Sequence, residues 1–214
     1  MSLIAKSGQS IAPIPEGVYT AICYGVFDLG HQYSEKYHKS APKVVLSWEL
    51  PELRIDVERD GEKVNPPRAI SKRYTNSMNE KAILRKDLEA WRGKAFSAAE
   101  LKGFNLRKLL GAACQLQIIH KEVDGKTYAN VGTLMALPKG QKAPKPENQL
   151  QCFSFDEIEG NPVIPANIPE WVSNLIKQSS EWQQLSKPNG TTAQEQLPQP
   201  AMAAGADSED DLPF

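Results

Sequence analysis

The spacing of apolar residues changes twice within the first 137 residues, and this change constrains the fold more than any other feature. Five segments have the composition or the alternation of β-strands: 17–28, 44–50, 68–75, 114–118 and 128–135. Between the third and the fourth segment, apolar residues recur at helical spacing, at Leu84, Leu88 and Trp91. Asp124-Gly125 is a typical hairpin turn between the last two strands. The expected order is therefore strand, strand, strand, helix, strand, strand.

This order is that of the OB fold, a five-stranded Greek-key barrel. We therefore expect a mainly β protein with some α, in which a helical insertion joins the third strand to the fourth. Gly25, within the first strand, suggests a bulge or bend of the kind that a strongly coiled sheet needs. An unrelated α+β sheet is the alternative, because the order of strands along the chain does not fix their pairing.

Local signals delimit the helical insertion. Asn79 can cap the main helix, and Gly93 can end it. Ser97 and Glu100 match a capping box at the start of a second, short helix, and Asn105 can cap a third helical turn.

Composition divides the chain into four parts. They are an N-terminal arm (1–16), the OB-fold domain (17–137), a peripheral connection with a C-terminal helix (138–186) and a disordered acidic tail (187–214). Phe153, Phe155 and Ile158 are candidates to attach the connection to the domain. The tail has few large apolar residues, so we expect that it cannot bury enough surface to offset the entropy of ordering it.

The net charge of −1 conceals an uneven distribution of charges. After Pro188 there are five acids and no Lys or Arg, whereas the first 187 residues hold all 25 bases and 21 of the 26 acids, a net charge of +4. A mildly basic body with an acidic tail fits a nucleic-acid binder that carries an anionic arm.

The chain ends in Asp207-Ser208-Glu209-Asp210-Asp211, which holds four carboxylates, followed by Leu212-Pro213-Phe214. An acidic run before a C-terminal aromatic residue suits a pocket with an apolar floor and a basic rim on another protein. This end resembles that of bacterial single-stranded-DNA-binding proteins, which also finish with an acidic run and Pro-Phe. The resemblance implies that the tip recruits replication or repair proteins through Asp210, Asp211, Leu212, Pro213 and Phe214.

The body carries a second pattern, made of Tyr74 and several short segments. The segments are Leu84-Arg85-Lys86-Asp87-Leu88, Trp91-Arg92-Gly93, Phe104-Asn105-Leu106, Leu109-Leu110-Gly111 and Gly125-Lys126-Thr127-Tyr128-Ala129-Asn130-Val131. This pattern is similar to a group of small phage and prophage replication-cluster proteins, which are thought to be OB-fold binders of single-stranded DNA. The similarity covers residues 17–137 and implies the same fold and ligand, but it assigns no binding residue.

Binding of single strands without sequence preference requires cations that follow the phosphates and flat side chains on which bases stack. The candidate DNA-binding residues combine both kinds on a loop, the third strand and the last hairpin: Tyr33, Lys36, Tyr37 and Lys39; Lys72, Arg73 and Tyr74; Lys126 and Tyr128. The polar loop 30–42 interleaves its tyrosines with lysines, as a clamp around a strand would. Any single tyrosine is about equally compatible with a half-buried strand position, but for the loop we favour DNA binding, because two exposed tyrosines among lysines gain little by folding alone. We assign Trp48 and Trp91 to the core.

Enzymatic signatures are weak, and we expect no catalytic activity, metal or cofactor. Gly125-Lys126-Thr127 resembles the end of a phosphate-binding loop, but His120 occupies the position of its required glycine. Asp56, Glu58 and Asp60 fit the solvated face of a strand better than the carboxylates of a metal-dependent nuclease. The three histidines and three cysteines lack the spacing of metal ligands.

The cysteines also lack a disulfide pattern, and neither a signal peptide nor a membrane span is apparent in the sequence. We therefore expect a cytoplasmic protein of a bacterium or of a phage-infected host cell. The favoured function is binding of single-stranded DNA, with the tip recruiting partners. The alternative is an adaptor that binds other proteins and has no DNA affinity, and a nuclease is a weaker third possibility. The sequence leaves open whether the protein forms a homo-oligomer.

Overall fold

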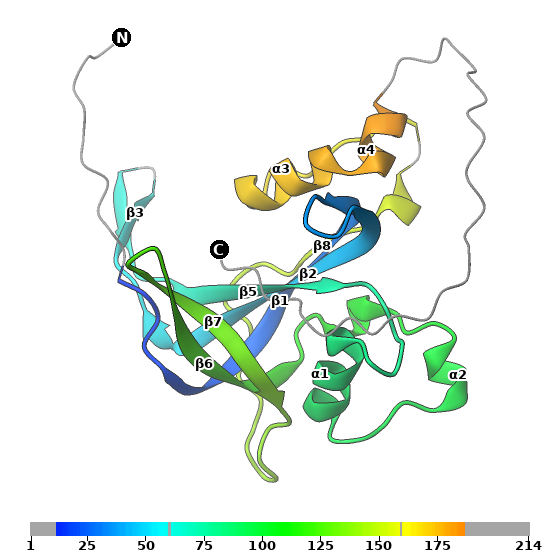
Figure 1. The fold of residues 1–214 in the computed structure, drawn as a ribbon. Helices are drawn as coiled ribbons and strands as arrows, with labels where there is room; N and C mark the ends of the chain where they lie inside the picture. Colours follow the sequence, from blue (N-terminus) through cyan, green and yellow to red (C-terminus); the bar gives the residue numbers. More distant parts are fainter. Residues whose placement is uncertain (1–11, 60, 159, 187–214) are drawn as a thin grey trace.

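The longest strand, β1 (Gly17–Ser34), lies at the centre of a curved, largely antiparallel sheet (Figure 1). The computed structural model describes residues 12–186, apart from residues 60 and 159. The sheet runs in the order β5-β2-β1-β6-β7, and its other strands are β2 (Lys39–Arg54), β5 (Pro67–Thr75), β6 (Ala113–Val123) and β7 (Lys126–Met135). A separate small hairpin consists of β3 (Val57–Arg59) and β4 (Glu62–Val64).

The predicted mainly β architecture with a few helices is confirmed. Each of the five predicted strands is present, and the helical insertion lies between β5 and β6. β5 and β7 are the two edges of the sheet, and the Lys72 ammonium donates a hydrogen bond of 3.5 Å from β5 to the Gly132 carbonyl of β7. This open sheet is compatible with a β-barrel-like fold.

Two irregularities bend β1 and let it pair with several neighbours. The register of β1 with β2 shifts between Cys23 and Gly25 and again between Asp28 and His31. At Gly25, an added Cβ would lie 2.6 Å from the Phe27 ring, so the predicted bulge requires glycine. The first part of β1 pairs with β6, and Gly25 to Phe27 pair in parallel with β8 (Gln151–Phe153).

Three helical segments connect β5 to β6: α1 (Ile83–Arg92), α2 (Ala98–Leu101) and the 3-10 helix η1 (Leu106–Leu109). Gly93 ends α1 in the left-handed conformation, with φ of 67°, as predicted. Ser97 and Glu100 form the predicted capping box of α2. The predicted cap of the third turn is also present, because the Asn105 side chain accepts the Arg107 N–H.

Two local predictions are wrong. Asn79 does not cap α1, because its carbonyl accepts the Ala82 N–H in a preceding turn and the helix begins only after Ala82. The polar loop expected over 30–42 is mostly strand, because β1 continues to pair with β2 as far as Ser34 opposite Lys39. Only residues 35–38 form the turn.

The inner face of the sheet carries the first core. Trp48 of β2 is fully buried there, and its ring centroid lies 6.0 Å from that of Trp91 on α1. Leu84 and Leu88 place the apolar stripe of α1 against the same core. The Trp91 indole N–H donates to the Ala113 carbonyl at the start of β6. The assignment of both tryptophans to the core is therefore confirmed.

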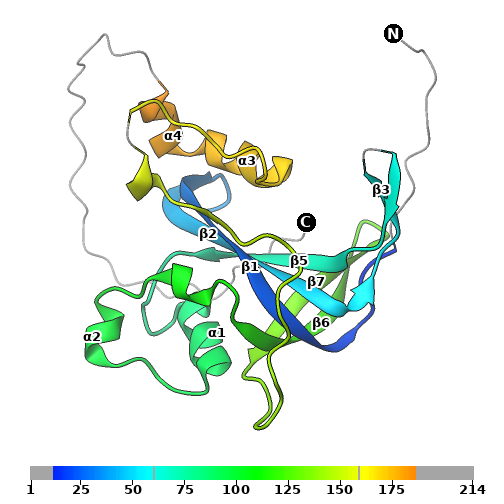
Figure 2. The same ribbon diagram turned by 180° about the vertical axis from the view of Figure 1, so that it is seen from behind.

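The outer face carries a second core, between the sheet and the C-terminal segment (Figure 2). That segment contains β8, the 3-10 helix η2 (Phe155–Glu157), α3 (Glu170–Gln178) and α4 (Ser180–Leu185). The buried residues of this core are Phe27, Leu29, Val45, Phe153, Ile168, Val172 and Ile176. Phe155 and Ile158 pack against it, as predicted. The segment expected to be a peripheral connection thus supplies a strand of the sheet and one side of a core.

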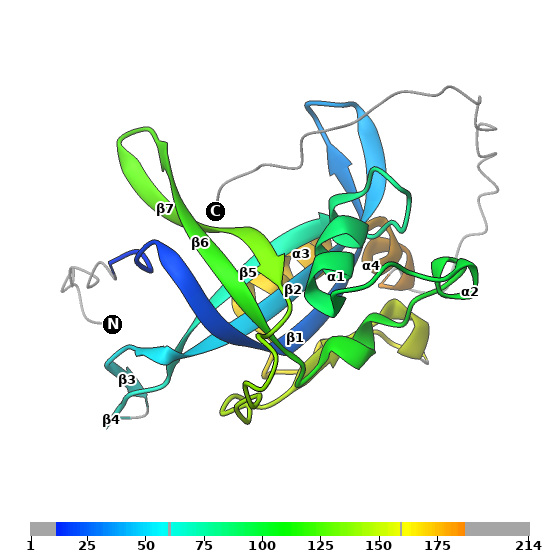
Figure 3. The same cartoon turned by 90° about the horizontal axis from the view of Figure 1, so that it is seen from below.

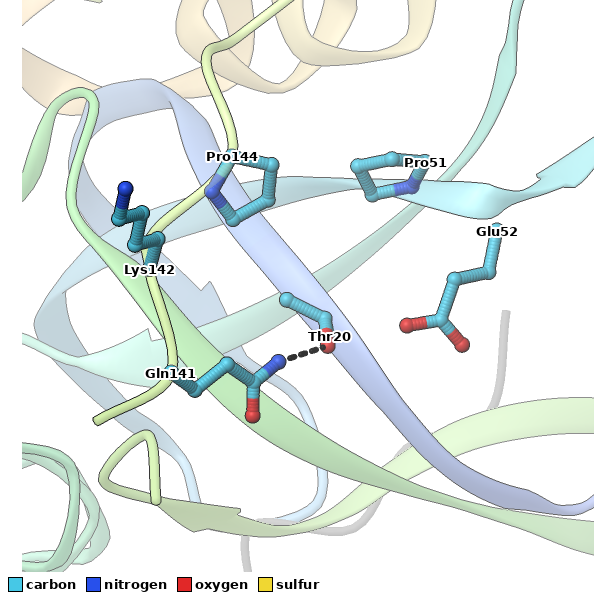
Figure 4. Close-up of a pocket in the computed structure, with 6 residues that line it drawn as sticks. All are labelled: Thr20, Pro51, Glu52, Gln141, Lys142 and Pro144. Atoms are coloured by element: carbon cyan, nitrogen blue, oxygen red, sulfur yellow. Dashed lines mark hydrogen bonds between the residues drawn. The ribbon is translucent and has the colours of Figure 1, made fainter. Parts of the chain in front are cut away.

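Residues 141–148, here called the strap, cross the outer face of the sheet (Figure 2). The fully buried Glu49 carboxylate of β2 accepts the backbone N–H groups of Glu147 (2.7 Å) and Asn148 (2.8 Å), and the Asn148 side chain (2.6 Å). At the other end, the Gln141 amide donates to the Thr20 hydroxyl (3.1 Å) at the wall of an open cavity of about 310 Å³ (Figure 4). Glu49 therefore fixes the strap to the sheet.

The described part of the N-terminal segment, residues 12–16, packs against the body although the sequence predicted a loose arm. Ile14 is buried, and its carbonyl accepts a hydrogen bond of 2.7 Å from His120 Nε2 on β6. The Glu16 carboxylate accepts the His120 N–H (2.7 Å), and the Ala12 carbonyl accepts Arg68 Nη2 (2.6 Å).

We predict that Glu49→Ala lowers the free energy of unfolding by about 1–3 kcal/mol, because three N–H groups of the strap lose the carboxylate that accepts them. Chemical denaturation measures this change. Glu52→Ala is the control, since it removes an exposed carboxylate three positions further along β2. Equal losses for the two variants would show that Glu49 does not hold the strap.

Candidate nucleic-acid interface

The β1–β2 hairpin exposes the tyrosines that the sequence singled out. Tyr33 is 63% exposed and Tyr37 is 43% exposed, so both rings are accessible from solvent. Lys36 lies over the Tyr37 ring, with its ammonium 5.1 Å from the ring centroid. The hairpin therefore offers two accessible rings with a cation beside one of them.

The register separates these residues into two faces. Tyr33 pairs with Ser40, whereas Lys39 pairs with Ser34 on the neighbouring position. Because side chains alternate along a strand, Tyr33 and Lys39 point to opposite faces of the hairpin. The Tyr33 hydroxyl lies 3.3 Å from Nδ1 of His38, which has a positive φ of 49° in the turn. A strand that contacts Tyr33 would thus meet Lys39 only by passing around the tip.

The base of this hairpin is fixed to the C-terminal helices. The His31 N–H donates to Glu181 Oε2 of α4 (2.8 Å), and His31 Nδ1 lies 2.5 Å from Glu181 Oε1. The Gln32 side chain donates to the Leu175 carbonyl of α3 (2.9 Å). Burial by itself raises the pKa of Glu181, but the hydrogen bonds from His31 outweigh it and bring the pKa below its usual range. The exposed turn is therefore carried on an anchored stem.

The β6–β7 hairpin carries the second group of predicted residues. Lys126 and Tyr128 are on β7, Tyr128 lies directly opposite Lys121, and Lys126 lies opposite Val123. Residues that face each other or alternate along a strand share a face, so Lys121, Lys126 and Tyr128 form one surface. Lys121 was missed by the sequence analysis. The two-residue turn at Asp124-Gly125 fixes this register and was the signal that could have found it.

Exposed apolar residues extend this surface toward β1. Ile119 precedes Lys121 by two positions and is 41% exposed, and Val18, opposite Gln117, is 50% exposed. The Tyr128 ring is half-buried rather than fully exposed. The face therefore combines cations, one aromatic ring and apolar side chains.

The two hairpins project to the same side of the molecule, on either side of β5, as Figure 3 shows. They come from different parts of the chain and end in short turns, at 35–38 and at Asp124-Gly125. The fold thus directs two of the three predicted groups the same way, with their tips apart.

The third group, on β5, is directed elsewhere. Tyr74 is only 1% exposed, and its hydroxyl donates to Asp87 of α1 (2.8 Å). Burial, and then the Asp87 carboxylate, raise the pKa of Tyr74 well above its usual range. Lys72 forms an ion pair with the same carboxylate (3.0 Å). Tyr74 is therefore a core residue with no ring face open to a base, and Lys72 is engaged in the fold.

Arg73 lies on the opposite face of β5, since it pairs with Val45 of the outer core and side chains alternate along the strand. Of the acids considered for a nuclease, Asp56 accepts the Asn65 side-chain amide (2.6 Å), and residue 60 lies outside the described residues. Within the described ranges, no group of three or more His, Cys, Asp or Glu residues is arranged to hold a metal ion.

We predict that Glu181→Ala speeds amide hydrogen exchange in the β1–β2 hairpin, because the hairpin stem loses its two bonds to α4. Hydrogen-exchange mass spectrometry measures this, with Gln184→Ala on the exposed side of the same helix as control. In the unmodified protein the lowered pKa of Glu181 means that the anchor stabilises the folded state fully above the usual Glu range. This stabilisation is lost as the pH falls through the lowered pKa. If neither Glu181→Ala nor the fall in pH changed the rate of hydrogen exchange in the hairpin, the anchoring role of Glu181 would be contradicted.

The predicted partner-binding tip, Asp210 to Phe214, lies outside the described residues. No described helix has both the length and the apolar character needed to cross a membrane. Comparison with known proteins adds no identity: no protein-family model matches the chain, and no curated protein matches it.

Proposed function

We propose that this protein is an OB-fold binder of single-stranded DNA that acts without sequence preference in replication or recombination. The fold part of the proposal is supported by the strand order β5-β2-β1-β6-β7 with a helix between β5 and β6, which corresponds to 3-2-1-4-5 with the helix after strand 3. The observation that carries the function is that two hairpins project to the same side of the sheet, one with exposed Tyr33 and Tyr37 and the other with half-buried Tyr128, and both with exposed lysines.

The chemistry of these hairpins fits a single strand better than a duplex. Unstacked bases can lie on Tyr33, Tyr37 and Tyr128, and each stacked base is worth roughly 1–3 kcal/mol. The same two hairpins carry lysines that can neutralise phosphates: Lys36, Lys39, Lys121 and Lys126. None of these contacts reads a base edge, so they carry no sequence preference.

Because of the strap, the expected contacts with DNA lie away from the face of the sheet. OB folds bind oligonucleotides on the face of their second and third strands and on the two flanking loops. Here the strap and the outer core cover the outer face of β2, so the hairpin tips supply most of the proposed surface. We propose further that the acidic tip recruits replication or repair proteins, while the body holds DNA.

Titration of the full chain with a labelled oligothymidine of about 30 nucleotides, at low and high salt, tests the proposal. We expect tight binding that weakens steeply with salt, and weak binding of a matched duplex. Absence of binding at low salt would overturn the DNA-binding function and favour the adaptor.

Substitutions separate stacking from charge. Tyr33→Ala and Tyr37→Ala should each weaken oligothymidine binding about fivefold or more, because each loses a stacking platform, whereas the Phe variants should retain most of the affinity. Lys36→Ala, Lys39→Ala and Lys126→Ala should each reduce the slope of log affinity against log salt by about 0.7. Tyr74→Phe should leave DNA affinity unchanged while costing about 1 kcal/mol of stability, since its hydroxyl is buried. Unchanged oligothymidine affinity in the Tyr33→Ala and Tyr37→Ala variants would exclude these tyrosines as stacking platforms.

Removal of residues 207–214 tests the tail. We expect DNA binding to tighten modestly, by less than about tenfold, because four carboxylates no longer compete with phosphates for the basic body. Recruitment of replication or repair proteins, measured by co-purification from a host extract, should be lost. A truncated chain that behaves like the full one in both measurements would contradict the proposed role of the tail.

A further inference from the structure

We infer that a pocket at the C-terminal end of α1 binds a single phosphorylated nucleotide, at a site separate from the two hairpins. The kind of ligand rests on the proposed DNA binding, but the pocket itself involves neither hairpin tip. Its volume is about 400 Å³, within the range of small-molecule sites. Its lining includes Trp91, Arg92, Lys94, Glu100, Phe104 and Lys108.

The pocket has an apolar floor with one accessible ring. Trp91 and Leu109 are buried, and the hydrogen bond of 2.9 Å from Trp91 Nε1 to the Ala113 carbonyl fixes the indole. Phe104 is half-buried and packs edge-on against Phe96, with ring centroids 5.0 Å apart. A planar base entering the pocket would lie on these apolar groups.

The charges around this floor are mostly positive and partly uncompensated. Lys94 and Lys108 are exposed at its rim, and within the described part of the chain neither ammonium has a hydrogen-bond or ion-pair partner. Glu100 is the one acid among the lining residues. The Ser97 N–H and the Arg92 guanidinium hold its pKa at about 2, so its negative charge is already matched within the fold.

Arg92 provides a further sign that an acceptor is missing. Its guanidinium lies over the rings of Phe96 (4.2 Å to the centroid) and Phe104 (5.5 Å), and Nη2 donates to Glu100 (2.5 Å). Nη1 is buried and has no hydrogen-bond partner among the described residues. Buried donors on a charged group almost always have an acceptor. Because Arg92 lines the pocket, a phosphate oxygen bound there is a candidate for this acceptor.

Charge counting favours a nucleotide over the chain's own acidic tip, the other anionic aromatic ligand of this protein. The tip carries four side-chain carboxylates in residues 207–214. The two uncompensated lysines match instead the one to two negative charges of a single phosphate group. The charge of the pocket therefore suits one nucleotide unit rather than a long acidic segment.

The pocket and the β6–β7 turn lie at opposite ends of β6. Ala113 begins this strand, and the turn at Asp124-Gly125 follows its other end, roughly 35 Å away at the usual rise of a strand. In Figure 1 the helices α1 and α2 lie at the lower right, whereas the β6–β7 turn lies at the left. Occupation of one site therefore does not block the other.

The test is an NMR titration of the full chain with thymidine 5′-monophosphate, which follows the Trp91 indole N–H and uses unphosphorylated thymidine as the matched ligand. We expect the monophosphate, but not thymidine at equal concentration, to shift the Trp91 signal. The double variant Lys94→Ala/Lys108→Ala should weaken the monophosphate about tenfold, because two phosphate contacts are lost. Lys102→Ala, which removes an exposed lysine next to the pocket but outside its lining, should have no effect.

Three outcomes would overturn the inference: no shift of the Trp91 signal, equal shifts with thymidine, or tighter binding of a peptide of residues 207–214 in the pocket. The last outcome would assign the pocket to the tip. Failure here with intact oligothymidine binding would leave the proposed function standing. Loss of oligothymidine binding in the hairpin variants, with the Trp91 shift retained, would confirm that the two sites are separate.

Discussion

The burial of β2 on both of its faces is the constraint on which the rest of the structure depends. From Val44 to Leu50 every residue is buried, with the inner residues against α1 and the outer ones against the C-terminal segment. Polar groups on a strand inside a two-sided core are costly to leave unpaired, although the Trp48 indole N–H has no partner among the described residues. Ser47 therefore shares a hydrogen bond with Ser71 on β5, and Glu49 accepts three N–H groups from the strap. The sheet, the helices and the strap meet at this strand.

The sequence predicted the elements with local signals and missed those that depend on distant residues. The capping box at Ser97, the bulge at Gly25 and the Asp124-Gly125 turn each need only a few neighbouring residues, and all three are present. In the sequence, the apolar residues Val44, Leu46, Trp48 and Leu50 of β2 recur at every second position, with Ser47 and Glu49 between them. Both faces are buried in the fold, because residues about a hundred or more positions later cover the outer one. Local sequence did not indicate this cover, since β8 has only three residues and no pattern of its own.

The candidate DNA-binding residues also divide into those that local sequence could identify and those that depend on distant residues. Tyr33, Tyr37 and Tyr74 all stand among basic residues in the sequence, yet Tyr74 faces α1 and only the two hairpin tyrosines are exposed. Nothing local distinguishes them, because the difference arises from Asp87, which accepts the Tyr74 hydroxyl from another element. Lys121, by contrast, was within reach, since the register of a two-residue hairpin follows from its turn.

The outer core also determines the order in which this chain can fold. The stem of the first hairpin can form its bonds to α4 only after Glu181 has been synthesised, 150 positions after His31. Likewise, Phe27, Leu29 and Val45 stay uncovered until the last helices have been synthesised. Pairings so distant in sequence make folding slow and expose apolar surface during synthesis. A chain that stopped at residue 137, where the sequence suggested a domain boundary, would keep that surface open to other molecules. The smallest unit that folds without this hazard includes α3 and α4.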